Sequence, residues 1–202
     1  MNSEISKTVE CLKSGGIIIY PSDTIWAIGC DATNSKAIKR IFKIKKRDLK
    51  FPLICLMNNY QMLNKYVNIT DEIKDYLHLQ KKPTTIIYNK IKEFSLYNKS
   101  LAVRIPKDEF CQKLISVFNK PITSTSVNIS GDKFPECFNQ IKTEILNQID
   151  YSVNLKRNEK LKTPSQIIKI DGDSHTIRSS DVGGEAIYWK EWVKDMQGRR
   201  VK

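Results

Sequence analysis

Histidine and closely spaced cysteines are scarce in this 202-residue chain. Its two histidines are His78 and His175, and none of its five cysteines forms a CxxC pair. Zinc sites and disulfide scaffolds need such residues at short spacings, and a Ser-His-Asp triad needs a histidine base. The sequence therefore favours reduced thiols and predicts no metal site made of protein side chains.

Long apolar runs are also lacking. The apolar run Ile17–Tyr20 is far shorter than the about 20 residues that span a bilayer. The first residues, Met1–Glu4, show no basic segment followed by an apolar stretch, as a secretory signal would. We therefore expect a cytoplasmic chain without membrane contact.

The common nucleotide and RNA signatures are missing as well. The sequence contains neither GxxxxGK[ST] nor GxGxxG, so any ATP site must be of another type. It also contains no RNA-recognition aromatic motif and no zinc-finger spacing. Recognition of a nucleotide or a nucleic acid would have to rest on residues outside these patterns.

Positive charge, in contrast, is abundant. The chain has 34 Lys and Arg against 22 Asp and Glu, a net charge of +12. Positive potential speeds the association of nucleotides, nucleic acids and other anionic partners. The same charge is also compatible with a lysine-rich solvated surface. A polyanionic partner is favoured, and both interpretations stay open.

Short apolar segments alternate with helical patterns along the chain. The pattern predicts an α/β fold, a twisted mixed parallel and antiparallel sheet covered by helices. No linker divides the chain, so we expect one domain over residues 1–202, with a core of about residues 5–183 and a C-terminal helix and basic tail at 184–202. The strands expected are Ile17–Tyr20, Leu53–Met57, Thr85–Tyr88, Leu101–Ile105, Pro121–Thr123, Gln166–Ile170 and His175–Arg178. The helices expected are one capped by Asn34 or Ser35, then Asp71–Leu79, Asp108–Phe118 and Asn139–Ile149.

Three polar clusters lie next to these elements. Pro21–Thr24 follows a strand, Lys45–Arg47 ends a helix, and Thr123–Gly131 carries hydroxyl and amide side chains after a strand. Ligands bind beyond the carboxyl ends of strands in α/β sheets, and Lys and Arg bind phosphate. The alternative explanations are ordinary turns for the first and third clusters and cations that offset a helix dipole for the second. The third cluster is the most site-like of the three.

Two isolated arginines add to these clusters. Arg104 lies inside the apolar run Leu101–Ile105, where a buried charge needs a partner. A substrate carboxylate and a structural Asp or Glu are both candidates for that partner. Arg178 stands at the end of another expected strand, before two serines.

Taken in order, these segments resemble the YrdC-like family of threonylcarbamoyl-adenylate synthases. Lys45-Lys46-Arg47 is similar to the KxR element of the family, and Ser126-Val127-Asn128 is similar to its SxN element. The resemblance runs from about Gly15 to Gly183. Its remaining blocks are Gly16–Ala32, Val103–Pro106 and Thr163–Ser165, with Arg178 near the usual terminal arginine.

The resemblance implies both a reaction and a set of site residues. The implied enzyme forms threonylcarbamoyl-AMP and pyrophosphate from ATP, L-threonine and bicarbonate, with Mg²⁺ beside ATP. Lys45 and Arg47 would be catalytic. The implied ATP contacts are Lys45, Arg47, Ser100, Asn128 and Arg178. The implied threonine contacts are Ser22, Arg104, Ser126 and Ser165.

The resemblance also implies partners. The product would pass to separate threonylcarbamoyl-transferase proteins that modify tRNA, and the basic surface would contact tRNA or another RNA. The alternative is a non-catalytic module of the same fold that binds tRNA or double-stranded RNA. The sequence departs from the family pattern at Ala27, Asp48, Phe51, Leu56 and Lys82.

Overall fold

The computed structural model describes residues 1–49, 53–89, 91–92, 94, 100–170, 176–177 and 187–188. The helices are α1 (Asn2–Lys13), α2 (Ser35–Lys45), α3 (Tyr60–Leu63), α4 (Asp71–Leu79), α5 (Glu109–Phe118) and α6 (Thr143–Leu146), with a 3₁₀ turn η1 (Phe138–Gln140). The first strands are β1 (Ile18–Pro21), β2 (Trp26–Gly29), β3 (Ile54–Leu56), β4 (Thr84–Tyr88) and β5 (Leu101–Arg104). The later strands are β6 (Ile122–Ser126), β7 (Tyr151–Ser152), β8 (Gln166–Ile170), β9 (Thr176–Ile177) and β10 (Ile187–Tyr188).

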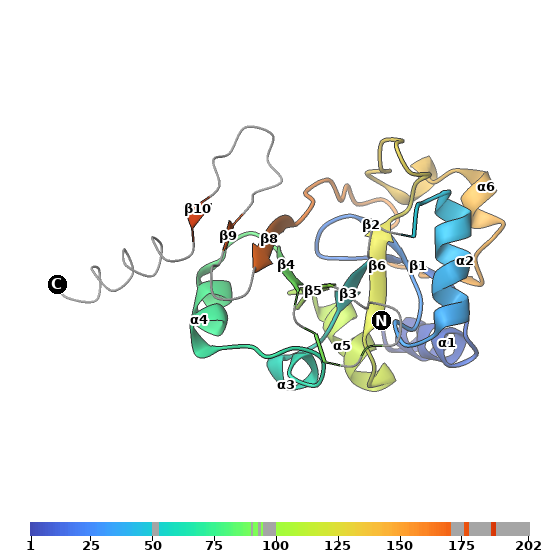
Figure 1. Ribbon diagram of the computed structural model, residues 1–202. Helices are drawn as coiled ribbons and strands as arrows, with labels where there is room; N and C mark the ends of the chain where they lie inside the picture. The colour runs from blue at the N-terminus through green and yellow to red at the C-terminus, as the bar shows by residue number, and fades with distance from the viewer. Residues whose placement is uncertain are drawn as a thin grey trace.

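One mixed sheet organises the fold. Its eight strands run in the order β7-β1-β2-β6-β3-β5-β4-β8, and β9 pairs with β10 separately. The β1–β7, β3–β5 and β4–β8 pairs are parallel, and the other four neighbouring pairs are antiparallel. Helices lie around this sheet, with α2 beside β1 and β2 (Figure 1). The predicted α/β class with a mixed, helix-covered sheet is confirmed.

The helix α2 forms as its sequence indicates. The side chain of Asn34 accepts hydrogen bonds from the backbone N–H groups of Lys36 and Ala37, and so caps the helix. The buried stripe that includes Ile38 and Ile41 packs against the core beside β1 and β2. The helix ends at Lys45, and its C-cap residue Lys46 has a left-handed φ of 50°. This end carries the KxR element to the carboxyl end of β6.

Several elements were not anticipated, among them helix α1 and strand β2. Helix α1 buries Ile5, Val9 and Leu12, a spacing that indicates a helix in the sequence itself. It is followed by a turn in which Gly15 has a φ of +80° that suits glycine. Strand β2 follows the β1 turn and pairs antiparallel with β1, as a hairpin does.

Two predicted elements need correction. The predicted helix Asn139–Ile149 is wrong, because Lys142 is extended (ψ 134°) and separates the turn η1 from the four-residue α6. The buried side chains of Ile141 and Ile145 thus reach the core from two separate turns. Strand β6 extends to Ser126, so the hydroxyl-rich segment begins inside a central strand and not after it.

The C-terminal part of the sequence is only partly described. The predicted strand His175–Arg178 is described at Thr176 and Ile177 alone, and both of its end residues lie outside the described residues. The predicted C-terminal helix is wrong at Ile187 and Tyr188, which form strand β10, and its other residues lie outside the described residues. Within the described ranges, no helix is both long and apolar enough to span a bilayer.

Gly29 allows β2 and β6 to approach closely, and its replacement tests this packing. A Cβ atom on Gly29 would overlap the carbonyl oxygen of Thr123 and lie 3.0 Å from Cε1 of Tyr20. We predict that Gly29→Ala lowers the free energy of unfolding by about 3 kcal/mol or more, since the clash is with a central strand. Urea denaturation of both proteins measures the difference.

The matched control is Gly131→Ala. A Cβ atom there meets nothing within 4 Å, so only the φ of +94° carries a cost, of about 1–2 kcal/mol. Equal losses of stability in the two variants would contradict the predicted strand contact.

Candidate functional site

A cavity of about 600 Å³ opens on the sheet. In β3, β4 and β5 it is lined by alternate residues, while the intervening Cys55, Ile86 and Val103 belong to the hydrophobic core. The strand residues lining it are Ile54, Thr85, Ile87, Ala102, Arg104, Ser124, Thr125, Ser126 and Ile167, and the loops add Thr24, Ile25, Arg47, Leu53, Pro164 and Ser165. Cationic, hydroxyl and apolar groups therefore share one space.

Four predicted site residues come together in this cavity. Arg47, Arg104, Ser126 and Ser165 all line it, although they come from separate parts of the chain. Arg47 follows helix α2, Ser126 ends β6, and Arg104 ends β5. The sheet order β6-β3-β5 places β6 and β5 on either side of β3, so that residues from all three strands line one face of the sheet.

The remaining predicted residues are placed differently. Ser100 comes one residue before β5, in the same alternation as Ala102 and Arg104, but does not line the cavity. The hydroxyl of Ser22 is 1% exposed and donates to the carbonyl of Ile25 at 2.8 Å. It also accepts from the backbone N–H of Thr24, so its hydrogen bonds close the β1–β2 turn. Arg178 lies outside the described residues.

Lys45 joins the KxR and SxN elements. Its side chain is 2% exposed, and its ammonium donates to the backbone carbonyls of Ser126 and Asn128, the latter at 2.8 Å. A further contact of 3.3 Å reaches Oδ1 of Asn128, and the carbonyl of Lys45 accepts from the N–H of Ser130. An ammonium has three donors. These contacts occupy all three within the SxN element.

Asn128 in turn holds the loop that follows it. Its side-chain amide donates to the carbonyls of Ile129 at 3.1 Å and Asp132 at 2.6 Å. Lys45 and Asn128 therefore form one hydrogen-bonded unit next to the cavity. This unit fixes the position of Ser126 and sets Arg47, two residues from Lys45, at the same edge.

Arg104 is a buried cation with an acidic partner. Its side chain is 3% exposed, and its Nη2 lies 3.1 Å from Oδ1 of Asp23, which is 6% exposed. The geometry is that of a charge contact, since Nε and Nη2 of Arg104 have no hydrogen-bond partner among the described residues. Buried guanidinium donors are normally hydrogen-bonded. Both of these nitrogens are buried, while Arg104 as a residue lines the cavity. The structural acid that the sequence left open is Asp23.

Sequence reasoning missed several hydroxyls of the cavity. Thr85 contacts Ser165 through a 2.8 Å hydrogen bond between the two hydroxyls, and both residues are buried. Thr24 and Thr125 also line the cavity. The alternation of strand residues predicts that Thr85 shares a face with Ile87, but which face is open depends on the packing of the whole sheet.

A second, smaller cavity of about 220 Å³ lies on the other face of β4 and β5. Ile86 and Val103 line it together with Tyr60, His78 and Lys82, among others. It contains none of the predicted site residues. The larger cavity is therefore the candidate site.

Metal binding by side chains finds no support among the described residues. They contain no group of three His, Cys, Asp or Glu side chains that could hold an ion. The described lining of the larger cavity also includes no carboxylate, the group by which proteins usually hold Mg²⁺. Its residues therefore do not fit a resident magnesium site.

Comparisons with known proteins identify the family of the chain. The Sua5/YciO/YrdC family, described as "Telomere recombination", matches residues 10–180. A protein of Methanocaldococcus jannaschii is 32% identical over 177 residues, which cover 84% of each chain. A threonylcarbamoyl-AMP synthase of Photobacterium profundum is 34% identical over 157 residues, 72% of this chain and 80% of its own.

Solved structures share the fold. E. coli YciO has a TM-score of 0.76 at 20% identity and covers 91% of this chain and 92% of its own. P. abyssi Sua5 complexed with L-threonine has a TM-score of 0.72 at 23% identity, over 84% of this chain and 51% of its own. At these identities the similarity concerns the fold alone.

Lys45 gives a prediction on stability and pH. Burial, and secondly the charge of Arg47, lowers the pKa of Lys45 from 10.5 to about 7. From pH 7 to 10.5 the unfolded chain therefore binds more protons at this residue than the folded chain, and the stability contributed by Lys45 rises with pH. Compared with Lys45→Met, the wild-type free energy of unfolding should rise by about 1 kcal/mol per pH unit between about pH 7.5 and 9.5. Urea titrations at several pH values test this, and a constant difference between the two proteins would contradict it.

Proposed function

The chain belongs to the Sua5/YciO/YrdC family, and from that premise we infer that it is a threonylcarbamoyl-AMP synthase. Such an enzyme joins ATP, L-threonine and bicarbonate into threonylcarbamoyl-AMP and releases pyrophosphate and water. The observation that carries the inference is the cavity itself, where Arg47 and Arg104 stand with Ser126 and Ser165. The two arginines supply separate cationic groups for the two anionic substrates.

We propose that threonine binds at Arg104. Arg104 lines the cavity, and a guanidinium can bind a carboxylate with two parallel hydrogen bonds. Ser126 and Ser165 are proposed to contact the rest of the amino acid, together with Thr85, whose hydroxyl is bonded to Ser165. Ser22 supports this site through its turn, which carries Thr24 into the cavity lining. A direct contact of Ser22 with threonine stays a prediction.

We propose that ATP binds at the KxR and SxN elements. Arg47 lines the cavity and can meet the phosphates directly. Lys45 donates hydrogen bonds to Asn128. We propose that the two residues act on ATP indirectly, by fixing the position of the loop against which the nucleotide would lie. A direct contact of Lys45 or Asn128 with ATP stays a prediction of the resemblance, as do contacts of Ser100 and Arg178.

In the proposed reaction, the amine of threonine first takes up bicarbonate as a carbamate, with loss of water. A carbamate oxygen then forms a bond to the α-phosphorus, and the bond from that phosphorus to the bridging oxygen of pyrophosphate breaks. No side chain becomes a covalent nucleophile, so the residues contribute orientation and charge. Mg²⁺ is proposed to enter as the counter-ion of the ATP triphosphate and not as a protein-held ion.

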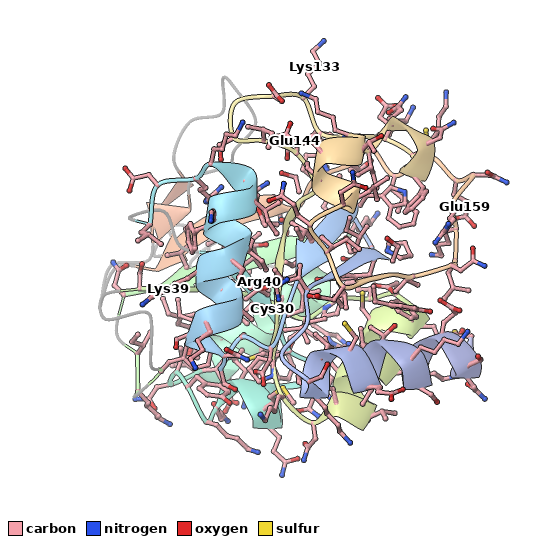
Figure 2. The ribbon with its side chains drawn as sticks, turned by 90° about the vertical axis from the view of Figure 1, so that its right-hand side faces the viewer. Cys30, Lys39, Arg40, Lys133, Glu144 and Glu159 are labelled. Carbon is pink, nitrogen blue, oxygen red and sulfur yellow. The ribbon has the colours of Figure 1, made fainter. Side chains whose placement is uncertain are left out.

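The reaction predicts a substrate-dependent release of pyrophosphate. We expect release only when ATP, L-threonine and bicarbonate are all present, and we expect Arg47→Ala and Lys45→Ala to lower turnover about tenfold to a thousandfold. The matched control is Arg40→Ala. Arg40 belongs to the same helix α2 (Figure 2), is half-exposed, and pairs with Asp150 outside the cavity.

The outcomes of this assay are distinct. Wild-type turnover in both Arg47→Ala and Lys45→Ala would contradict the proposed roles. Pyrophosphate release that needs neither threonine nor bicarbonate would contradict the proposed reaction. RNA binding without any pyrophosphate release would instead support the binding module that the sequence left open.

We propose that the product serves tRNA modification by separate transferase proteins in the cytoplasm. The net charge of +12 supports a contact with RNA. Exposed cations follow one another along α2, from Lys36 and Lys39 to Lys43. A contact through such groups should weaken steeply as salt is raised.

A further inference from the structure

We propose that Asp23 is the positioning residue that holds Arg104 in place for the carboxylate of threonine. This inference rests on the proposed function. Asp23 is not among the residues that line the cavity, whereas Arg104 is. Its role would be exerted entirely through Arg104, so we distinguish it from the groups that touch the substrates.

The carboxylate of Asp23 connects three segments. Its Oδ1 lies 3.1 Å from Nη2 of Arg104, at the end of β5. Its Oδ2 accepts a hydrogen bond of 3.2 Å from the backbone N–H of Lys107, in the segment that leads to α5. Asp23 itself belongs to the β1–β2 turn that Ser22 closes. The turn, the strand end and the helix entry therefore meet at one buried carboxylate.

The burial of both partners makes this contact strong. The two side chains are 3% and 6% exposed, so water screens their attraction very little. A buried cation without a partner is highly unfavourable. A long arginine side chain could relieve that situation by turning toward water. The Asp23 carboxylate prevents such a movement while Nε and Nη2 stay free of hydrogen bonds among the described residues.

Other titratable groups lie near, but none has the same contact. Asp108 is half-buried, caps α5 through the N–H of Cys111 at 2.8 Å, and has a pKa raised by burial. Cys111 and Tyr20 are buried in the same region, and burial raises the pKa of both side chains, so they stay neutral. The carboxylate recorded in an ion pair with Arg104 is that of Asp23.

The consequence for the reaction is geometric. Arg104 and Arg47 would hold the two substrates, and the carbamate oxygen has to meet the α-phosphorus in line. A misplacement of about 1 Å can lower a rate about a hundredfold. Arg104 has several rotatable bonds, so its position depends on the groups that hold it from outside the cavity. Asp23 supplies that restraint.

A double-mutant cycle tests the proposal. Asp23→Asn keeps the shape of the side chain and an acceptor for Lys107 but removes the charge. We expect it to lower kcat/KM for L-threonine about tenfold or more, since a charged restraint is replaced by a neutral one. The KM for ATP should change less than about twofold. In the background of Arg104→Gln, Asp23→Asn should cause little further loss, because the residue through which it acts is already gone.

Asp108→Asn is the matched control. It makes the same chemical change at a neighbouring carboxylate that does not pair with Arg104, and asparagine is also a good helix cap. We expect its kcat/KM for threonine to stay within about twofold of wild type. If Asp23→Asn does not fold, as judged from its thermal unfolding, Asp23→Glu retains the charge but displaces it, and should still lower kcat/KM for threonine.

The outcomes separate the inference from the function on which it rests. A wild-type protein without threonine-dependent pyrophosphate release would overturn the proposed function. An active wild type together with an unchanged Asp23→Asn variant would overturn the role of Asp23 alone. Equal losses from Asp23→Asn in the wild-type and Arg104→Gln backgrounds would also overturn it, because the residue would then act independently of Arg104.

Discussion

The buried ammonium of Lys45 is the interaction on which the site depends. The ammonium links the end of α2 to the end of β6 by donating hydrogen bonds to the backbone carbonyls of Ser126 and Asn128. The backbone carbonyl of Lys45 also accepts a hydrogen bond from the N–H of Ser130. Without this contact, the loop after β6 would lack its main attachment to the helix. With it, Arg47 and Ser126 are fixed on one edge of the cavity. A lysine that would usually be exposed is thus used as an internal link, and its lowered pKa reflects that placement.

The sheet supplies the second constraint. Each strand presents alternate residues to its two faces, so the strands β4 and β5 build a core with Ile86 and Val103 and a cavity with Thr85 and Arg104. In β6 the consecutive residues Ser124, Thr125 and Ser126 all line the cavity. Most of the residues that line the cavity therefore belong to strands, and loops contribute the others.

The sequence alone predicted a large part of this arrangement. The class of fold, helix α2 with its Asn34 cap, and most strands follow from local patterns. Arg104 was recognised because a charge inside an apolar run requires a partner. These predictions succeeded because each depends on neighbours along the chain or on a simple cost of burial.

Most of the features that the sequence did not predict depend on contacts between distant segments. Nothing in the local sequence identifies Asp23 as the partner of Arg104, because the two meet only when β5 reaches the β1–β2 turn. The three acceptors around Lys45 are likewise a tertiary feature. The hydrogen bonds of Ser22, in contrast, are local and form the ordinary turn that the sequence left open. The helix expected at Asn139–Ile149 failed for a different reason: Ile141 and Ile145 have helical spacing, but the extended Lys142 separates them.

A crystal structure with L-threonine and a non-hydrolysable ATP analogue would test the central claim most directly. The account predicts that the threonine carboxylate binds the guanidinium of Arg104, with the triphosphate against Arg47 in the same cavity. Binding of either ligand in the smaller cavity beside Tyr60 and His78, or on the outer face of α2, would contradict it.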